Sequence, residues 1–175
     1  MNTTTLLFFE ANIEHVEQLT LLINSAYRGE SSRLGWTTEA DFLEGRRTDN
    51  EEIQRLLTDT DSMIMSCDCQ TELIGSVHLH KIGHEVHIGM LAVSPPLQGR
   101  GIGKQLLQVA EQTAIQKWSI KRFVMSVIPH RGELIAFYER RGYQRTGISK
   151  PFPIKPSLWT PKVANLKLEL LEKLI

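Results

Sequence analysis

Residues 90–104 decide the fold, and they read MLAVSPPLQGRGIGK. The apolar run before Pro95 is typical of a strand end, because proline cannot continue a β-ladder. Beyond the three glycines, apolar residues recur at helical spacing over 102–114, which indicates a long helix with one buried face. The stretch therefore predicts a strand, a glycine-rich turn and a helix in immediate succession.

The turn has the properties of a site for a bulky anion. Glycine at three alternate positions lets backbone N–H groups approach a ligand without a Cβ clash. A helix start adds successive N–H donors and the positive end of the helix dipole. The side chains of Arg100 and Lys104 each add a full positive charge. We therefore predict a pyrophosphate site, made of Gln98, Gly99, Arg100, Gly101, Ile102, Gly103 and Lys104.

Other glycine-rich phosphate motifs do not fit this spacing. A Walker P-loop ends in Gly-Lys-Ser/Thr, but Gln105 follows Lys104 here, and Gln98 stands where its first glycine belongs. A dinucleotide fingerprint needs Gly-x-Gly-x-x-Gly and a later acidic residue, whereas these glycines alternate and the later strand begins with Lys121 and Arg122. A turn that binds nothing is also disfavoured, because each glycine weakens a helix start by about 1 kcal/mol relative to alanine.

The rest of the chain predicts one domain over residues 1–175, with a mixed α/β fold and a mostly antiparallel central sheet flanked by helices. Apolar residues at helical spacing indicate helices, and apolar runs bounded by turn residues indicate strands. The expected strands are 5–11, 62–69, 73–81, 85–93, 122–128, one from 143, and 164–171; the expected helices are 13–27, 37–45, 50–57, 102–114 and 133–141, with a proline-rich loop over 149–161.

Composition narrows the classes of function. The 175 residues carry 20 basic and 20 acidic side chains and no formal net charge, so no general attraction to nucleic acid or to an anionic membrane is expected. No apolar run is long enough to span a bilayer, and the N-terminus lacks the pattern of a signal peptide. We therefore expect a cytoplasmic protein, with Cys67 and Cys69 as reduced strand residues.

The histidines are the other group of chemically active residues. His78, His80, His84 and His87 lie close together in the sequence, with Glu85 among them. No carboxylate or cysteine has recognisable metal-ligand spacing with them, so no metal site is expected. Glu85 and His87 share one face of the strand that leads to the glycine turn.

The glycine-rich segment resembles the acetyl-CoA signature of the GNAT family of N-acetyltransferases, Arg/Gln-x-x-Gly-x-Gly/Ala. Here it reads Gln98-x-x-Gly101-x-Gly103. Residues 134–143, LIAFYERRGY, resemble the family's Phe-Tyr-x-x-x-Gly-Phe/Tyr segment, and the order of expected elements agrees over most of the chain. One position departs from the pattern, because Arg131 stands where many members carry an asparagine that contacts the cofactor.

The resemblance implies two sets of cofactor contacts. Leu91, Ala92 and Val93 match the strand end that holds pantetheine through backbone bonds. Tyr138 matches a tyrosine that faces the cofactor sulfur. A phenol, with a pKa of about 10, can donate a proton or hydrogen bond to a departing thiolate, whose thiol has a pKa of about 8.5. The alternative is that Tyr138 is a core aromatic on the apolar stripe of its helix.

The resemblance also implies acyl transfer from acetyl-CoA to a primary amine by direct attack. The amine must lose a proton, and several members place a glutamate base at the strand position of His87, where an imidazole also suits the task. His87, Glu85 and water stay open as the base. The alternative function is a non-catalytic acyl-CoA-binding module, which would keep the glycine turn but not need Tyr138, His87 or Glu85.

The expected partners are acetyl-CoA and an amine acceptor, with a homodimer left open. In the family the N-terminal helices line the acceptor pocket. The residues of this region that could contact an acceptor are Tyr27, Trp36, Glu39, Arg46 and Arg47. The sequence does not name the acceptor.

Overall fold

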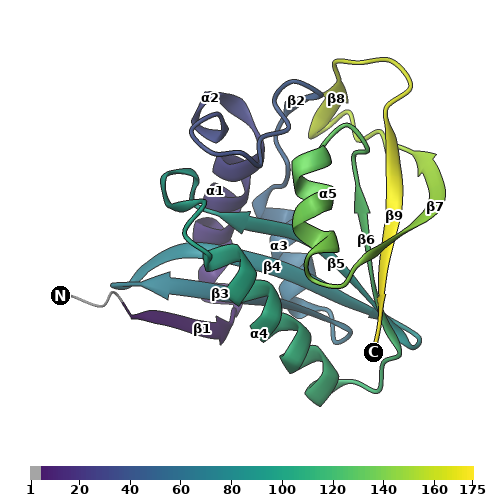
Figure 1. Cartoon of the computed structure of the whole chain (residues 1–175). Helices are drawn as coiled ribbons and strands as arrows, with labels where there is room; N and C mark the ends of the chain where they lie inside the picture. Colours follow the sequence, from purple (N-terminus) through teal and green to yellow (C-terminus); the bar gives the residue numbers. More distant parts are fainter. Residues whose placement is uncertain (1–4) are drawn as a thin grey trace.

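The computed structural model describes residues 5–175. Its main feature is a seven-stranded sheet in the order β1-β3-β4-β5-β6-β9-β7 (Figure 1). Neighbouring strands are antiparallel except β5 and β6, which run parallel. This confirms the mixed, mostly antiparallel sheet. The strands are β1 (Leu6–Glu10), β3 (Ser62–Cys69), β4 (Glu72–Ile82), β5 (Glu85–Val93), β6 (Arg122–Val127), β7 (Gln144–Pro151) and β9 (Lys167–Leu174).

Helices cover both faces of this sheet (Figure 1). Alternate residues of a strand point to opposite faces, so in β3 Met63 and Met65 enter one core while Ile64 enters the other. The first core packs against α4 (Ile102–Lys117) and α5 (Gly132–Glu139), and the second packs against α1 (Val16–Tyr27) and α3 (Asn50–Thr58). The main helices therefore form where apolar residues recur at helical spacing.

Three local predictions were wrong, at residues 29–32, 43–45 and 159–161. A short helix, α2 (Gly29–Ser32), forms in a polar stretch. The helix expected toward residue 45 is absent, and its end forms β2 (Leu43–Gly45), which pairs with β8 (Trp159–Pro161) inside the expected loop. Leu43 is buried there against Trp159, so a contact distant in sequence overrides the local pattern. β7 continues to Pro151, as an edge strand allows.

The parallel pair β5 and β6 separates before the end of β5. Their register runs from Glu85↔Arg122 to Ile88↔Met125 and stops there. A β-bulge follows on the other edge of β5, with Met90 at a φ of +50°. A bulge bends its strand and increases the local twist, so the last residues of β5 turn away from β6. This separation positions the two pockets described next.

Candidate active site

The glycine turn has open space above its backbone. Gly99 and Gly101 adopt φ values of +79° and +80°, which favour glycine, and a Cβ at either position would meet nothing within 4 Å. Gly103 is helical, and its Cβ would lie 3.5 Å from Val93 Cγ2, which is an ordinary contact. Gly101 is the N-cap of α4 and provides no side-chain cap. The first N–H groups of the helix therefore lack intrahelical acceptors.

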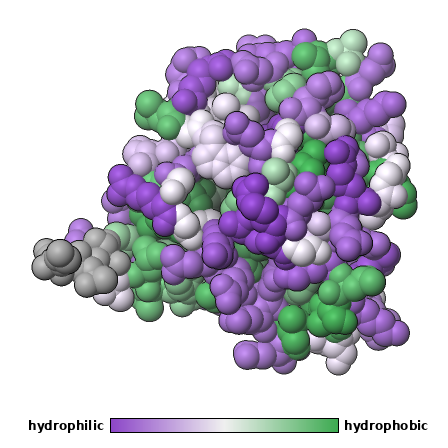
Figure 2. All heavy atoms as spheres, in the orientation of Figure 1, coloured by the Kyte–Doolittle hydropathy of each residue, from purple (hydrophilic) through white to green (hydrophobic). Residues whose placement is uncertain are grey.

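A cavity of about 370 Å³ lies beside this turn. It includes every predicted cofactor residue except Ala92, which is fully buried in the core on the α1 side, and Arg100, which is exposed. In the space-filling view, hydrophobic atoms show between hydrophilic ones around the start of α4 (Figure 2). The lining residues are Trp36, Thr37, Leu91, Val93, Leu97, Gln98, Gly99, Gly101, Ile102, Gly103, Lys104, Leu134, Phe137, Arg140 and Arg141.

The Gln98 side chain fixes the loop opposite the turn. Its amide nitrogen donates to Thr37 Oγ1 at 2.8 Å and to Val93 O at 3.0 Å, and its oxygen accepts from Trp36 N at 2.8 Å. The structure thus places Trp36, which we expected at the acceptor, beside the predicted cofactor residues. The hydrogen bond from the Trp36 N–H to Gln98 Oε1 holds the Trp36 backbone beside the turn.

Helix α5 contributes lining residues that sequence reasoning missed. Phe137 lies 5.9 Å from Trp36 between ring centroids, and the guanidinium of Arg141 lies 3.6 Å from the Phe137 ring centroid. Arg140 is the second cation at this end of the cavity. These positions flank Tyr138 in the segment that resembles the family motif, so the motif could have suggested them.

Tyr138 is buried next to this cavity and is not among its lining residues. Its ring contacts Phe137 and Tyr143 edge-on, at centroid distances of 5.2 Å and 5.8 Å. No hydrogen bond joins its hydroxyl to another side chain or backbone group of residues 5–175. Burial raises the pKa of Tyr138 well above its usual range. The phenol is therefore protonated at neutral pH and can act as a hydrogen-bond donor.

A second pocket, of about 220 Å³, lies where β5 and β6 separate. His87 lines it, as do Glu39 and Arg47 from the N-terminal segment. His87 pairs with Val124, one position before the β5–β6 register ends. The other lining residues are Arg28, Ile88, Gly89, Val124, Met125, Ser126, Phe152, Pro153, Trp159 and Leu168.

Glu85 is held away from both pockets. Its Oε1 atom accepts hydrogen bonds from Nε and Nη2 of Arg122, and its Oε2 lies 3.4 Å from His87 Nε2. The hydrogen bonds from Arg122 are the main cause that lowers the pKa of Glu85. The carboxylate is therefore a weak base, and its contact with His87 suits a role in orienting the imidazole.

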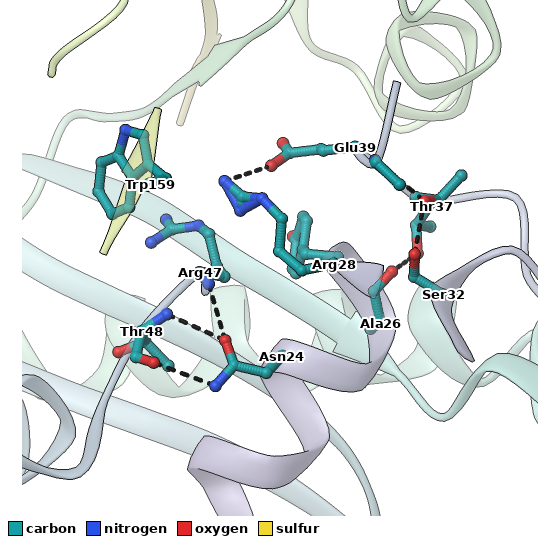
Figure 3. Close-up of polar contacts among 12 residues, drawn as sticks. Asn24, Ala26, Arg28, Ser32, Thr37, Glu39, Arg47, Thr48 and Trp159 are labelled. Atoms are coloured by element: carbon teal, nitrogen blue, oxygen red, sulfur yellow. Dashed lines mark hydrogen bonds and ion pairs between the residues drawn. The ribbon is translucent and has the colours of Figure 1, made fainter. Parts of the chain in front are cut away.

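A buried charge cluster lies between the two pockets, and Figure 3 shows its ion pair of Arg28 with Glu39. Glu39 lies 3.2 Å from Arg28 Nη2 through Oε2 and 3.1 Å from Arg131 Nη1 through Oε1. Arg131 also donates to the carbonyl of Thr37, which lines the first pocket. Arg131, at the position of the family asparagine, thus holds the loop that runs from Thr37 to Glu39.

Two other residues expected at the acceptor lie outside the second pocket. The Tyr27 hydroxyl donates to the carbonyl of Leu91 at 2.7 Å, and its burial raises the pKa of Tyr27 to about 12. Arg46 is exposed and lines a shallow hollow at the end of α1. Sequence reasoning missed Arg28, Phe152 and Trp159 in this pocket.

The histidines do not gather around a common centre. His78 Nε2 lies 2.8 Å from Ser62 Oγ, and burial lowers the pKa of His78 to about 4. His84 Nδ1 lies 3.2 Å from Ser119 O. Among residues 5–175 there is no group of three or more His, Cys, Asp or Glu side chains arranged to hold a metal ion. In the same part of the chain, no helix has the length and apolar character that a membrane span requires.

Solved structures of N-acetyltransferases share this fold. The PaiA N-acetyltransferase from Thermoplasma acidophilum, in complex with coenzyme A, has a TM-score of 0.70 and 17% identity over 98% of this chain and 99% of that one. The ribosomal-protein-S18-alanine N-acetyltransferase from Escherichia coli has a TM-score of 0.74 and 10% identity over 98% and 94%. An N-acetyltransferase from Staphylococcus aureus Mu50 has a TM-score of 0.73 and 15% identity over 97% of both chains.

The sequence itself gives the family. No curated protein sequence matches the chain significantly. The sequence model of the Acetyltransferase (GNAT) family, in contrast, matches residues 17–143, from the first turn of α1 to Tyr143. This range contains the glycine turn, Tyr138 and His87. The chain therefore belongs to the GNAT acetyltransferase family and is an acyltransferase.

Proposed function

We propose that residues 1–175 act as one N-acetyltransferase domain. The domain transfers the acetyl group of acetyl-CoA to a primary amine of a small molecule or peptide by direct attack. The observation that carries this proposal is the cavity at the glycine turn, where two glycines with positive φ leave open space beside helix-start N–H groups. The coenzyme A bound to the Thermoplasma acidophilum relative supports the choice of ligand.

The residues at the turn fit acetyl-CoA. The open backbone from Gly99 to Gly103 would hold the pyrophosphate, with Lys104 as an adjacent cation. The carbonyl of Leu91 already accepts a hydrogen bond from the Tyr27 hydroxyl, and the carbonyl of Val93 accepts one from the Gln98 side-chain amide. Because N–H and C=O of one strand residue point to the same side, the N–H groups of Leu91 and Val93 are the bonding groups left for pantetheine.

Tyr138 and His87 would divide the proton transfers of the reaction. His87 takes the proton from the ammonium form of the acceptor or from the tetrahedral adduct, directly or through water. The amine nitrogen forms a bond to the thioester carbon, and the C–S bond breaks. Tyr138 donates a hydrogen bond to the departing sulfur. No covalent enzyme intermediate is needed, and Glu85 orients the His87 imidazole.

Two measurements test this function. Calorimetry with acetyl-CoA should show binding, and a screen of amines with acetyl-CoA should release free thiol. The screen covers polyamines, amino acids, aminoglycosides and peptide N-termini. Binding without thiol release for any amine would favour a non-catalytic acyl-CoA-binding module. Absence of acetyl-CoA binding would overturn the proposal altogether.

A further inference from the structure

We propose that the acceptor is a small amine that carries a carboxylate, and that Arg28 and Arg47 bind this carboxylate in the second pocket. The proposal rests on the amine acetylation proposed above and specifies its substrate class. It starts from the polar groups that the fold leaves unsatisfied in a pocket lined by His87.

Arg28 is buried without the hydrogen bonds that its guanidinium requires. The residue is 5% exposed, and Nε, Nη1 and Nη2 are all buried with no hydrogen-bond partner among the described residues. The Nη2 atom lies 3.2 Å from Glu39 Oε2, which neutralises charge but does not have hydrogen-bonding geometry. Buried polar groups in native proteins are nearly always satisfied. A ligand that accepts from Arg28 would supply the missing bonds.

Arg47 brings a second guanidinium to the same pocket. Its contacts within the described chain are with aromatic faces, 5.9 Å from the Tyr27 centroid and 5.8 Å from the Trp159 centroid. Asn24 fixes the backbone beneath it, because Asn24 Oδ1 accepts from the N–H groups of Arg47 and Thr48 at 2.7 Å and 3.1 Å (Figure 3). The side chain therefore starts from a rigid position and keeps its donors for a ligand.

The charge of the pocket favours an anion. Glu39 is its acidic residue, and its two carboxylate oxygens lie within ion-pair distance of Arg28 and Arg131, although Oε2 accepts no hydrogen bond from the described residues. Arg47 adds a further positive charge that no carboxylate of the described chain pairs with. Guanidinium groups match a carboxylate well, because their planar donors bond to both of its oxygens.

The walls and size of the pocket favour a compact acceptor with an apolar body. Trp159 and Phe152 meet edge-on at a centroid distance of 6.3 Å, and Ile88, Met125 and Leu168 complete an apolar surface. The volume of about 220 Å³ is below the range of about 300–1,000 Å³ typical for drug-sized ligands. A free amino acid with an apolar or aromatic side chain fits this pocket, because its carboxylate can meet the arginines, its side chain can meet the apolar lining, and it is small enough for the volume.

Matched pairs of acceptors test the carboxylate directly. Free amino acids are compared with their α-amides, which keep the side chain and the amine but lose the negative charge. We expect kcat/KM to be roughly 10- to 150-fold higher for the preferred amino acid than for its amide, the range for a hydrogen bond to a charged group. Because the amide has the less basic amine, ionisation of the amine cannot produce this preference. Equal rates for both members of every pair would overturn the proposal.

Variants of two adjacent arginines locate the site. Arg47→Gln should bring the ratio of kcat/KM for the amino acid to kcat/KM for its amide close to one. Arg46→Gln is the matched control, because Arg46 is exposed and lies outside the pocket. Arg47→Gln with wild-type discrimination would contradict the assignment of Arg47.

Binding separates this inference from the proposed transfer reaction. Amino acids are titrated calorimetrically into protein saturated with coenzyme A, with the aminophosphonate and the dipeptide of the same side chain as further arms. Binding of the amino acid that Arg47→Gln weakens supports the carboxylate site even if no thiol is released, in which case the transfer proposal fails alone. Tighter binding of the phosphonate or no binding of any amino acid would reject the carboxylate, and equal binding of the dipeptide, which also has a carboxylate, would reject the free amino acid as the acceptor. Thiol release with polyamines alone would reject it while keeping the transfer reaction.

Discussion

The Gln98 side chain donates a hydrogen bond of 3.0 Å to the carbonyl oxygen of Val93 and so ties the glycine turn to the end of β5. A Cβ on Gly35 would lie 2.4 Å from Gln98 Oε1, so the glycine at position 35 leaves room for this side chain. The first residue of the family signature therefore has a bracing role here: it sets the distance between the turn, the strand end and the loop at Thr37.

Gln98→Ala should weaken the connection between the glycine turn, the end of β5 and the loop at Thr37. Loss of the bonds to Val93 and Thr37 is expected to lower the free energy of unfolding by about 1–3 kcal/mol, because buried partners lose their hydrogen bonds. The affinity for acetyl-CoA should fall as well. Urea unfolding and calorimetry measure both quantities, with Gln105→Ala, an exposed glutamine on α4, as the control. A variant that matches the control in both measurements would show that the brace is unimportant.

Replacing Gly101 or Gly103 by glutamate should abolish acetyl-CoA binding. Gly101→Glu and Gly103→Glu each place a bulky negative group where the pyrophosphate is proposed to lie. Gly103→Ala is the steric control, because its Cβ would make an ordinary contact of 3.5 Å with Val93. It should keep the fold and much of the affinity. Calorimetry that shows wild-type affinity in both glutamate variants would remove the turn from the cofactor site.

Tyr138→Phe should lower kcat by roughly ten- to a thousandfold, as for loss of one acid or donor. Acetyl-CoA affinity should change little, because the lost bond forms in the transition state. Stability should also change little, since the Tyr138 hydroxyl makes no hydrogen bond within residues 5–175. Because the pKa of Tyr138 is raised, its phenol should add no limb to the pH–rate profile at neutral pH.

Tyr143→Phe is the matched control for Tyr138. Its hydroxyl donates to Glu111 Oε1 at 2.6 Å, and Glu111 also binds Lys173 at 2.6 Å. Removing this hydroxyl should cost about 1–3 kcal/mol of stability and leave kcat nearly unchanged. Equal kcat for wild type and Tyr138→Phe would make Tyr138 a core aromatic.

Local sequence patterns were sufficient for the sheet and for the glycine turn. The α4 stripe and the strand before Pro95 are set by near neighbours in sequence, so periodicity and proline identify them. The β2–β8 pair depends instead on Leu43 meeting Trp159. No local pattern encodes such a contact, and tertiary packing decided the structure of both segments.

The second pocket could not be predicted from the sequence for the same reason. Arg28 follows the last residue of α1, where a basic side chain is ordinarily exposed at the helix end. It is buried here, and the ring centroid of Trp159, far away in sequence, lies 5.8 Å from its guanidinium carbon. The position of Trp36 beside the glycine turn likewise depends on a residue far away in sequence, Gln98. Sites built from distant segments need the fold before their members can be recognised.

His78 should make the protein less stable at mildly acidic pH. Its pKa is lowered from 6.5 to about 4 by burial, so between these values the unfolded chain takes up a proton that the folded chain does not. Stability is therefore complete above pH 6.5 and falls as the pH drops toward 4. The expected loss between pH 7 and pH 5 is about 1–2 kcal/mol.

Urea unfolding at a series of pH values measures this effect. His78→Gln should flatten the dependence between pH 7 and pH 5, because glutamine does not titrate. His84→Gln, at an exposed position, should keep the wild-type slope. A wild-type slope in His78→Gln would assign the acid sensitivity to other groups.

His87→Gln should lower kcat and remove the rising limb of the pH–rate profile. The imidazole lines the second pocket and has its Nε2 3.4 Å from Glu85 Oε2. The Glu85 carboxylate is bound by Arg122, which lowers its pKa, so it is already charged when the limb appears. Glu85→Gln should therefore keep the limb, because the Glu85 carboxylate is not the group that loses its proton there. Arg122 keeps its hydrogen bond of 2.8 Å to Glu172 in that variant, so the pairing of this side chain is not lost altogether.

The opposite pattern would make Glu85 the base. In that pattern the limb is lost in Glu85→Gln and kept in His87→Gln. Profiles that overlay the wild type in both variants would assign proton removal to water.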